Sequence, residues 1–169
     1  MGRKIHPVGF RLGINKTWEG RWFAEGRQYT EQLHQDFAIR KIVVKETEKA
    51  GVSRIEVERF PNNTVVTIFT ARPGVVIGRR GDQVKKIRQQ LEQLTGAKVK
   101  VEVEEISQPD LDAQLVAENI AGQLERRIGH SRAMKRAISQ AMRQGAQGIR
   151  IVCAGRLAGV GGTVAGAQV

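Results

Sequence analysis

The chain is short of cysteine and of long apolar runs, and each shortage excludes a class of protein. A single cysteine, Cys153, among 169 residues cannot form an intramolecular disulfide framework and suits a reducing compartment. No uninterrupted apolar run reaches the roughly 18 residues of a membrane span, and the basic start of the chain has no apolar segment behind it. We therefore expect a cytoplasmic protein with no membrane partner.

Residues able to carry catalysis or hold a metal ion are also scarce. The three histidines lie in unrelated segments without the spacing of metal ligands, and no nucleotide P-loop is present. Four acidic residues around position 107 are the best metal candidates, although a solvated linker with a helix N-cap at Asp110 explains them better. They are Glu104, Glu105, Asp110 and Asp112. The sequence predicts no enzyme activity, no metal and no cofactor.

Positive charge is what the chain has in excess. There are 28 Lys and Arg against 17 Asp and Glu, for a net charge of +11. A surplus of this size indicates a polyanionic partner such as a nucleic acid. The last acidic residue is Glu125, and residues 126–169 carry eight basic residues with no carboxylate. Polyanion binding should therefore be strongest in the rear of the chain.

Residues 1–27 form a basic arm without a sustained helical or strand period. Aromatic side chains are interleaved with the basic ones: Phe10, Trp18, Trp22 and Phe23. The arm could become ordered on RNA, with bases stacking on the rings and Lys4 and Arg11 contacting the backbone. Alternatively, the rings pack back on the domain that follows. The sequence leaves both interpretations open.

A first folded domain is predicted over residues 28–107. Apolar periodicity predicts a helix over 29–49 with an apolar stripe of Leu33, Phe37, Ile42 and Val43. It also predicts strands near 55–59 and 65–69 joined by a turn, a helix over about 82–95 and a strand over 99–103. A short apolar segment before residue 78 supplies one more helix. The element order is then helix–strand–strand–helix–helix–strand, and the fold class is α+β.

The connection between the last two helices reads Gly78-Arg79-Arg80-Gly81. A glycine-x-x-glycine loop between two helices is how a KH domain grips the backbone of a single-stranded nucleic acid. Glycines let the main chain approach phosphates, and amides at the start of the next helix point at the anion. We expect the four loop residues, together with Lys85 in the following helix, to bind RNA.

A second domain is predicted over residues 108–158, and a tail rich in Gly, Ala and Val over 159–169. The second domain should contain a helix from Asp110 to about residue 128, a helix over 131–144 and a strand over 149–154. Basic residues gather on the second helix, which has no acidic residue, and at the end of the first. They are Arg126, Arg127, Arg132, Lys135, Arg136 and Arg143. A solvated helix face normally mixes charges, so this pattern favours nucleic-acid binding.

Several of these segments together resemble one family, that of bacterial ribosomal protein S-three of the small subunit. The segments are Gly2 to Gly13, Ser53-Arg54-Ile55, Thr70 to Gly78, Leu124 to Arg127, Arg132 to Ala137 and Gly148 to Leu157. The resemblance implies a type II KH domain followed by a second α/β domain in the head of the small subunit. It also implies binding to small-subunit ribosomal RNA, contact with ribosomal proteins ten and fourteen, and a place along the channel by which mRNA enters.

The chain departs from that family in two places. Ser131 stands where members commonly have arginine, which weakens the cluster carried over to Arg126, Arg127, Arg132, Lys135 and Arg136. After Gly159 the sequence lacks the strands that complete the family's second domain, so we expect that domain to be incomplete. A free KH-domain regulator or RNA-processing accessory acting off the ribosome is the alternative function, and a nuclease lacks any catalytic constellation.

Overall fold

The computed structural model describes residues 3–155 and the backbone of 163–168. It divides into two compact units, Met1–Glu105 and Ile106–Val169, where the sequence analysis placed the domain boundary between residues 107 and 108. Among the described residues, no helix is long and apolar enough to cross a membrane. Each unit has its own hydrophobic core.

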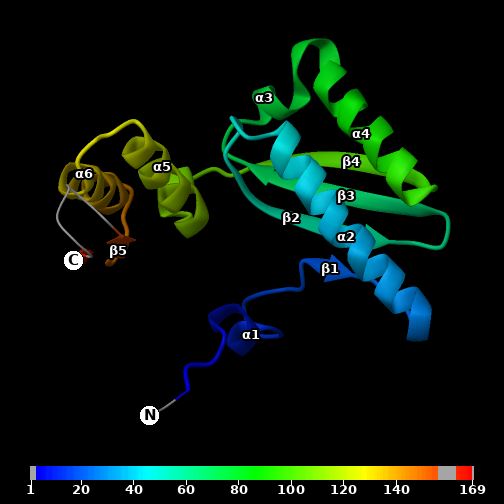
Figure 1. Ribbon diagram of the computed structural model, residues 1–169, viewed down its shortest axis with the longest axis horizontal. Coiled ribbons are helices and arrows are strands. Elements are labelled where there is room, and N and C mark those ends of the chain that lie inside the picture. The colour runs from blue at the N-terminus through cyan, green and yellow to red at the C-terminus, as the bar shows by residue number, and fades with distance from the viewer. Residues whose placement is uncertain (1–2, 156–162, 169) are drawn as a thin grey trace. The chain divides into compact units, whose positions relative to one another are not determined.

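A four-stranded sheet with the order β1-β2-β3-β4 forms the first unit (Figure 1). The strands are β1 (Gly20–Arg21), β2 (Val52–Arg59), β3 (Asn63–Thr70) and β4 (Lys98–Glu105). β2 and β3 form an antiparallel hairpin, whereas β3 and β4 are parallel. Parallel strands require a crossover connection, and here residues 71–97 supply it.

Two long helices cover one face of this sheet, α2 (Gly26–Glu46) and α4 (Asp82–Thr95), as Figure 1 shows. Ile39 of α2 and the pair Ile87 and Leu91 of α4 are fully buried against Ile68 of β3. Burial of each such side chain contributes about 1.5–3 kcal/mol. With the short helix α3 (Pro73–Ile77) before α4, the order helix–strand–strand–helix–helix–strand is confirmed, and so is the type II KH fold.

Helix α2 buries Val43 as predicted, but one residue of the predicted apolar stripe faces outward. Phe37 was expected on the apolar stripe but is 61% exposed, and Asp36 is buried instead. The Asp36 carboxylate accepts hydrogen bonds from the Arg59 guanidinium and from Nε1 of Trp22, the latter at 2.7 Å. The buried, paired carboxylate of Asp36 lies on the inner face and its neighbour in sequence points outward, so the apolar period alone misplaced Phe37.

The basic arm contains a short helix, α1 (Pro7–Arg11), and strand β1, neither of which was predicted. Trp22 packs back on the domain, with its ring 5.5 Å from that of Tyr29. Trp18 and Phe23 remain exposed, by 65% and 84% respectively, and so does Phe10. The two interpretations of the aromatic residues therefore hold for different rings.

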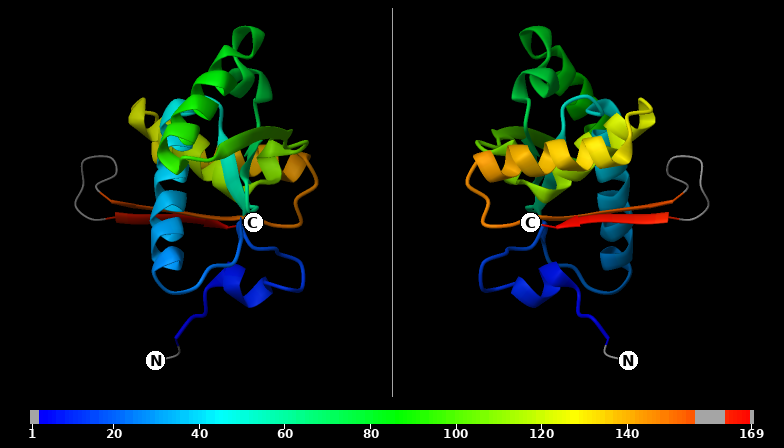
Figure 2. Two further views of the ribbon diagram at one scale, coloured as in Figure 1. Left: turned by 90° about the vertical axis from the view of Figure 1, so that its right-hand side faces the viewer. Right: turned by 90° about the vertical axis from the view of Figure 1, so that its left-hand side faces the viewer.

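The second unit contains two helices and a two-stranded antiparallel sheet. The elements are α5 (Ala113–Glu125), α6 (His130–Arg143), β5 (Arg150–Gly155) and β6 (Thr163–Gln168). Its core is small: Ile120 of α5 packs with Ala133 and Ala137 of α6, and Ile151 and Cys153 of β5 lie against them. Figure 2 shows β5 and β6 side by side in both views.

Two predictions for this unit are wrong. The sequence analysis expected no strand after Gly159, whereas β6 lies there and its backbone pairs with β5. Gly and Ala give no strand period that would predict it. The N-cap of α5 is Asp112 rather than Asp110, since Asp112 Oδ1 accepts from the amides of Gln114 and Leu115 at 3.0 and 3.1 Å. Residues 156–162 and 169 of the predicted tail and domain end lie outside the described residues.

Candidate nucleic-acid interface

The glycine loop has a backbone that only glycine adopts easily at its first position. Gly78 has φ 72° and ψ −177°, Arg80 has φ 53°, and Gly81 has φ 80°. A side-chain Cβ built at Gly78 would lie 2.8 Å from Cβ of Gln83, whereas one at Gly81 would meet nothing within 4 Å. Gly78 is therefore required both by its dihedral angles and by close packing.

Helix α4 begins directly at this loop, and a single 3-10 turn (Arg79–Gly81) leads into it. Its N-cap, Gly81, has no side chain to accept an amide hydrogen bond, and the amide of Asp82 donates to the carbonyl of Arg79. The first amides of a helix lack helical acceptors and carry partial positive charge. The partial positive charge at the start of α4 favours an anion there, and phosphate binding at this place stays a prediction.

The side chains around the loop add positive charge. Arg79 and Arg80 are exposed, and neither has an ion-pair partner among the described residues. Lys85, one turn into α4, lies 4.0 Å from Asp82 in a well-exposed pair. Exposed pairs of this kind are weak, so Lys85 would lose little interaction free energy by turning from Asp82 to a phosphate. The structure thus brings all five predicted loop residues together.

Buried hydrogen bonds fix the junction that leads into the loop. The Thr70 hydroxyl, fully buried at the end of β3, donates to the carbonyl of Ala50 at 2.9 Å and accepts from the amide of Arg72 at 3.1 Å. Arg72 is itself the exposed N-cap residue of α3. It was not among the predicted RNA contacts, although it stands in the same motif.

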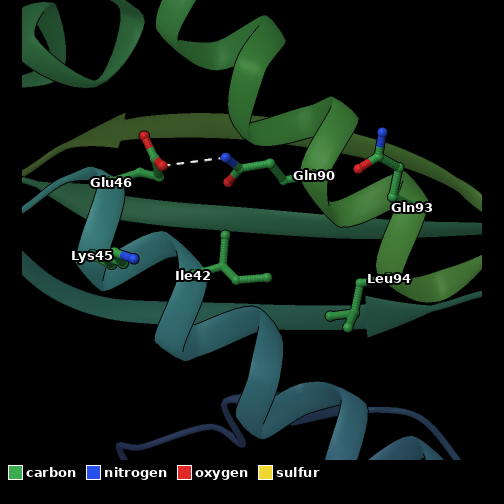
Figure 3. A pocket seen from close by; sticks show the side chains of 6 residues that line it. All are labelled: Ile42, Lys45, Glu46, Gln90, Gln93 and Leu94. Atoms are coloured by element: carbon green, nitrogen blue, oxygen red, sulfur yellow. Dashed lines mark hydrogen bonds between the residues drawn. The ribbon is translucent and has the colours of Figure 1, made fainter.

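A groove between α2 and α4 lies beside the loop helices and is shown in Figure 3. Its volume is about 470 Å³, and its lining is Ile42, Lys45, Glu46, Gln90, Gln93 and Leu94. Glu46 accepts hydrogen bonds there from Lys86 at 2.7 Å and from Gln90 at 3.2 Å. The bond from Lys86, followed by that from Gln90, lowers the pKa of Glu46 below its usual 4.5, so this carboxylate is charged at neutral pH.

A second basic surface lies on α6 in the second unit (Ile106–Val169), called the rear unit below. Its inner face carries the buried residues Met134 and Ala141, and its outer face carries the basic residues. Arg132, Lys135, Arg136 and Arg143 are all exposed. Among the described residues none of the four has an ion-pair partner, so their charges are available to a polyanion.

Arg126 and Arg127 end α5 with an unusual backbone. Arg126 is the C-cap residue, and the next residue, Arg127, has φ 62°, a left-handed conformation that glycine usually takes at this place. Both side chains are exposed. They belong to the same unit as the four basic residues of α6 and extend the same supply of unpaired positive charge.

The two predicted contacts in the arm are less well defined. Lys4 is exposed, and Arg11 donates to the carbonyl of Pro7 at 3.0 Å while lying 5.9 Å from the centre of the Phe10 ring. Exposed cation and ring side by side are suited to stacking on nucleic-acid bases.

Metal binding has no candidate here. Within residues 3–155 and 163–168, no group of three His, Cys, Asp or Glu side chains is placed to hold a metal ion. Of the acidic residues near position 107, Asp112 is the N-cap of α5.

The fold and the glycine loop between α3 and α4 define a KH domain of type II. Family models agree: the KH domain matches residues 38–111, and "Ribosomal protein S3, C-terminal domain" matches residues 120–163. The chain is 52% identical over 159 residues to small ribosomal subunit protein uS3 of Carboxydothermus hydrogenoformans, covering 94% of this chain and 72% of the relative. It is 56% identical over 159 residues to uS3 of Rhodospirillum centenum, covering 94% and 70%. The chain belongs to the uS3 family of small ribosomal subunit proteins.

Proposed function

We propose that the chain binds small-subunit ribosomal RNA in the head of the subunit and lines the channel by which messenger RNA enters. Membership of the uS3 family makes it a structural, RNA-binding constituent of the small ribosomal subunit in translation. The finer assignment rests on the acid-free basic surface of α6, together with Arg126 and Arg127 after the end of α5. We also propose that the protein is not an enzyme and that it contacts ribosomal proteins ten and fourteen. Its proposed location is the cytoplasm, on the ribosome.

The observation that carries this proposal is the unpaired charge of the rear unit. A regulator acting alone through its KH loop needs no second basic surface, whereas a protein held between ribosomal RNA and a moving message does. The α6 side chains can contact phosphates without reading sequence. We therefore assign them to RNA backbone, and the KH loop to a single-stranded segment.

Sedimentation of tagged protein from cells at low and high salt tests the ribosomal assignment. We expect it to travel with small subunits and to remain there at high salt. A protein that stays in the light fractions contradicts the assignment and favours the free KH regulator.

Site-directed crosslinking tests the position along the message. The native cysteine is first replaced in a Cys153→Ser background, and a photoreactive group is attached at Lys135→Cys or, as the control, at Lys45→Cys on α2. We expect message downstream of the decoding site to be crosslinked from position 135 only. Crosslinks to ribosomal RNA alone from position 135 would retain RNA binding but reject the channel assignment.

Salt dependence tests the phosphate contacts directly. For single-stranded RNA, each contact contributes about 0.7 to the slope of log K against log salt. Arg132→Gln with Arg136→Gln should therefore reduce the slope by about 1.4. Arg88→Gln, which removes a charge already paired with Glu92 at 2.9 Å, is the matched control and should leave the slope unchanged.

A further inference from the structure

The close approach of Gly78 to Gln83 links the glycine loop to a residue of α4 that has no charge of its own to offer RNA. The Cβ position of Gly78 would be 2.8 Å from Cβ and 3.1 Å from the backbone nitrogen of Gln83. The first glycine therefore rests directly on this residue. Any shift of Gln83 moves the support beneath the loop.

Gln83 is in turn held by the end of helix α2. Its amide Nε2 donates to the backbone carbonyl of Glu46 at 3.2 Å and to Glu46 Oε2 at 3.1 Å. Glu46 is the last residue of α2, so its carbonyl is one of the four that lack a helical donor. One side chain of α4 thus caps α2 and packs beneath the loop at the same time.

The acceptor in this link is an ionised group in a fixed place. The Glu46 side chain is only 16% exposed, and Lys86 donates to the same Oε2 at 2.7 Å. A hydrogen bond to a charged acceptor is about twice as strong as one between neutral groups. The lowered pKa of Glu46 agrees with a carboxylate that keeps its charge.

We propose that Gln83 and Glu46 are positioning residues for the phosphate-binding loop. They contact no RNA, but they fix Gly78 and the start of α4 against the C-terminal end of α2, so that the loop amides are already in place when a phosphate arrives. This inference rests on the proposed RNA-binding role of the loop. It names a cross-helix contact, 37 residues apart in sequence, as part of that site.

The chain itself supplies the control for this proposal. Gln90 lies two turns further along α4, and its Nε2 also donates to Glu46, at Oε1 and 3.2 Å. Figure 3 shows this hydrogen bond. Gln83→Leu and Gln90→Leu each remove one amide from the same carboxylate, but only Gln83 supports the loop. A purely structural role predicts similar effects of both variants on RNA binding.

The measurement is a site-resolved titration of the full chain with a single-stranded RNA of about four nucleotides, the length a KH loop holds. Amide resonances of Gly78 and Gly81 report binding at the loop and not at the rear basic surface. We expect Gln83→Leu to weaken this binding about tenfold, equivalent to about 1.4 kcal/mol, and Gln90→Leu to change it by less than about twofold. Glu46→Leu removes the carboxylate part of the same link and leaves the backbone carbonyl, so it should weaken binding in the same direction as Gln83→Leu but by less. It covers the case that Gln83→Leu does not fold.

A double-mutant cycle separates the inference from the function it rests on. In a background carrying Arg79→Gln and Arg80→Gln, binding should already be weak, and Gln83→Leu should weaken it little further. If the two arginine replacements weaken binding but Gln83→Leu behaves like Gln90→Leu, the positioning role is overturned alone. If the arginine replacements leave the loop resonances and their affinity unchanged, the loop does not bind RNA and both proposals fail.

Discussion

Arg80 and Arg127 share a left-handed backbone, with φ values of 53° and 62°, and among the described residues they are the non-glycine positions with positive φ. One lies in the KH loop and the other at the end of α5, each within a predicted RNA-binding set. A left-handed conformation costs an ordinary residue about 1–2 kcal/mol. Strain of this kind persists where the side chain has a use, and in both places that side chain is an exposed guanidinium.

Arg127→Gly should therefore stabilise the rear unit while weakening RNA binding. Relief of the left-handed strain, less the greater freedom of glycine in the unfolded chain, should raise the opening free energy of α5 by up to about 1 kcal/mol. Hydrogen exchange of α5 amides measures it. Arg126→Gly removes the same charge at φ −77° and should lower that free energy instead, so equal destabilisation by both variants would contradict the argument.

The two glycines of the loop should differ in their tolerance of a methyl group. Gly81→Ala meets no neighbour within 4 Å and should cost only the left-handed strain, about 1–2 kcal/mol. Gly78→Ala adds a contact with Gln83 at 2.8 Å and a φ/ψ combination nearly restricted to glycine. We expect a larger loss of stability in urea denaturation and a larger loss of RNA affinity for Gly78→Ala, whereas equal losses would disprove the packing argument.

Acid should weaken the first unit through Glu46. Because hydrogen bonds from Lys86, Gln90 and Gln83 lower its pKa in the folded state, the unfolded chain binds the proton more readily. The contribution is complete above the ordinary pKa of 4.5 and is lost as the pH falls through the lowered folded value.

Glu46→Gln removes that titration. The free energy of unfolding of the native chain and of Glu46→Gln is measured from about pH 7 to about pH 3. The difference between the two should shrink as the pH falls. A difference that stays constant with pH would show that the carboxylate contributes no charge-dependent stability.

The buried pair of Asp36 and Arg59 should be important for anchoring the arm. Their side chains are 9% and 11% exposed, so removal of the carboxylate leaves an uncompensated buried cation. We expect Asp36→Ala to lower the free energy of unfolding by about 3–5 kcal/mol. Trp22 also loses its acceptor, and in a Trp18→Phe background its emission should shift to longer wavelength. A loss of about 1 kcal/mol or less, as for an exposed pair, would contradict this assignment.

The KH loop and the order of the main elements could be predicted because their signals are local. Gly78 to Gly81 lie within four positions, and Val84, Ile87 and Leu91 repeat at the helical period. Strand β1 could not be predicted: two residues carry no period, and the strand exists because the amide of Val57 pairs with the carbonyl of Glu19.

Long-range pairing explains the other failures. Phe37 was placed in the core because nothing near it in sequence announces the bond between Asp36 and Arg59. The hydrogen bond between Gln83 and Glu46 could not be predicted from the sequence either, since each is an ordinary polar residue on a helix. Polar contacts between distant elements decide which helix face turns inward, and a single sequence carries no period for them.

The parallel pairing of β3 with β4 has a consequence for the time at which the protein becomes active during its synthesis. The loop and its two helices lie inside the connection between these strands, and parallel pairs form slowly because their contacts are distant in sequence. A growing chain that has passed Gly81 but not Glu105 holds the loop sequence without the strand that closes the domain. We expect such a nascent chain not to bind phosphate through the loop, so that RNA binding at the loop begins only when the first unit is complete.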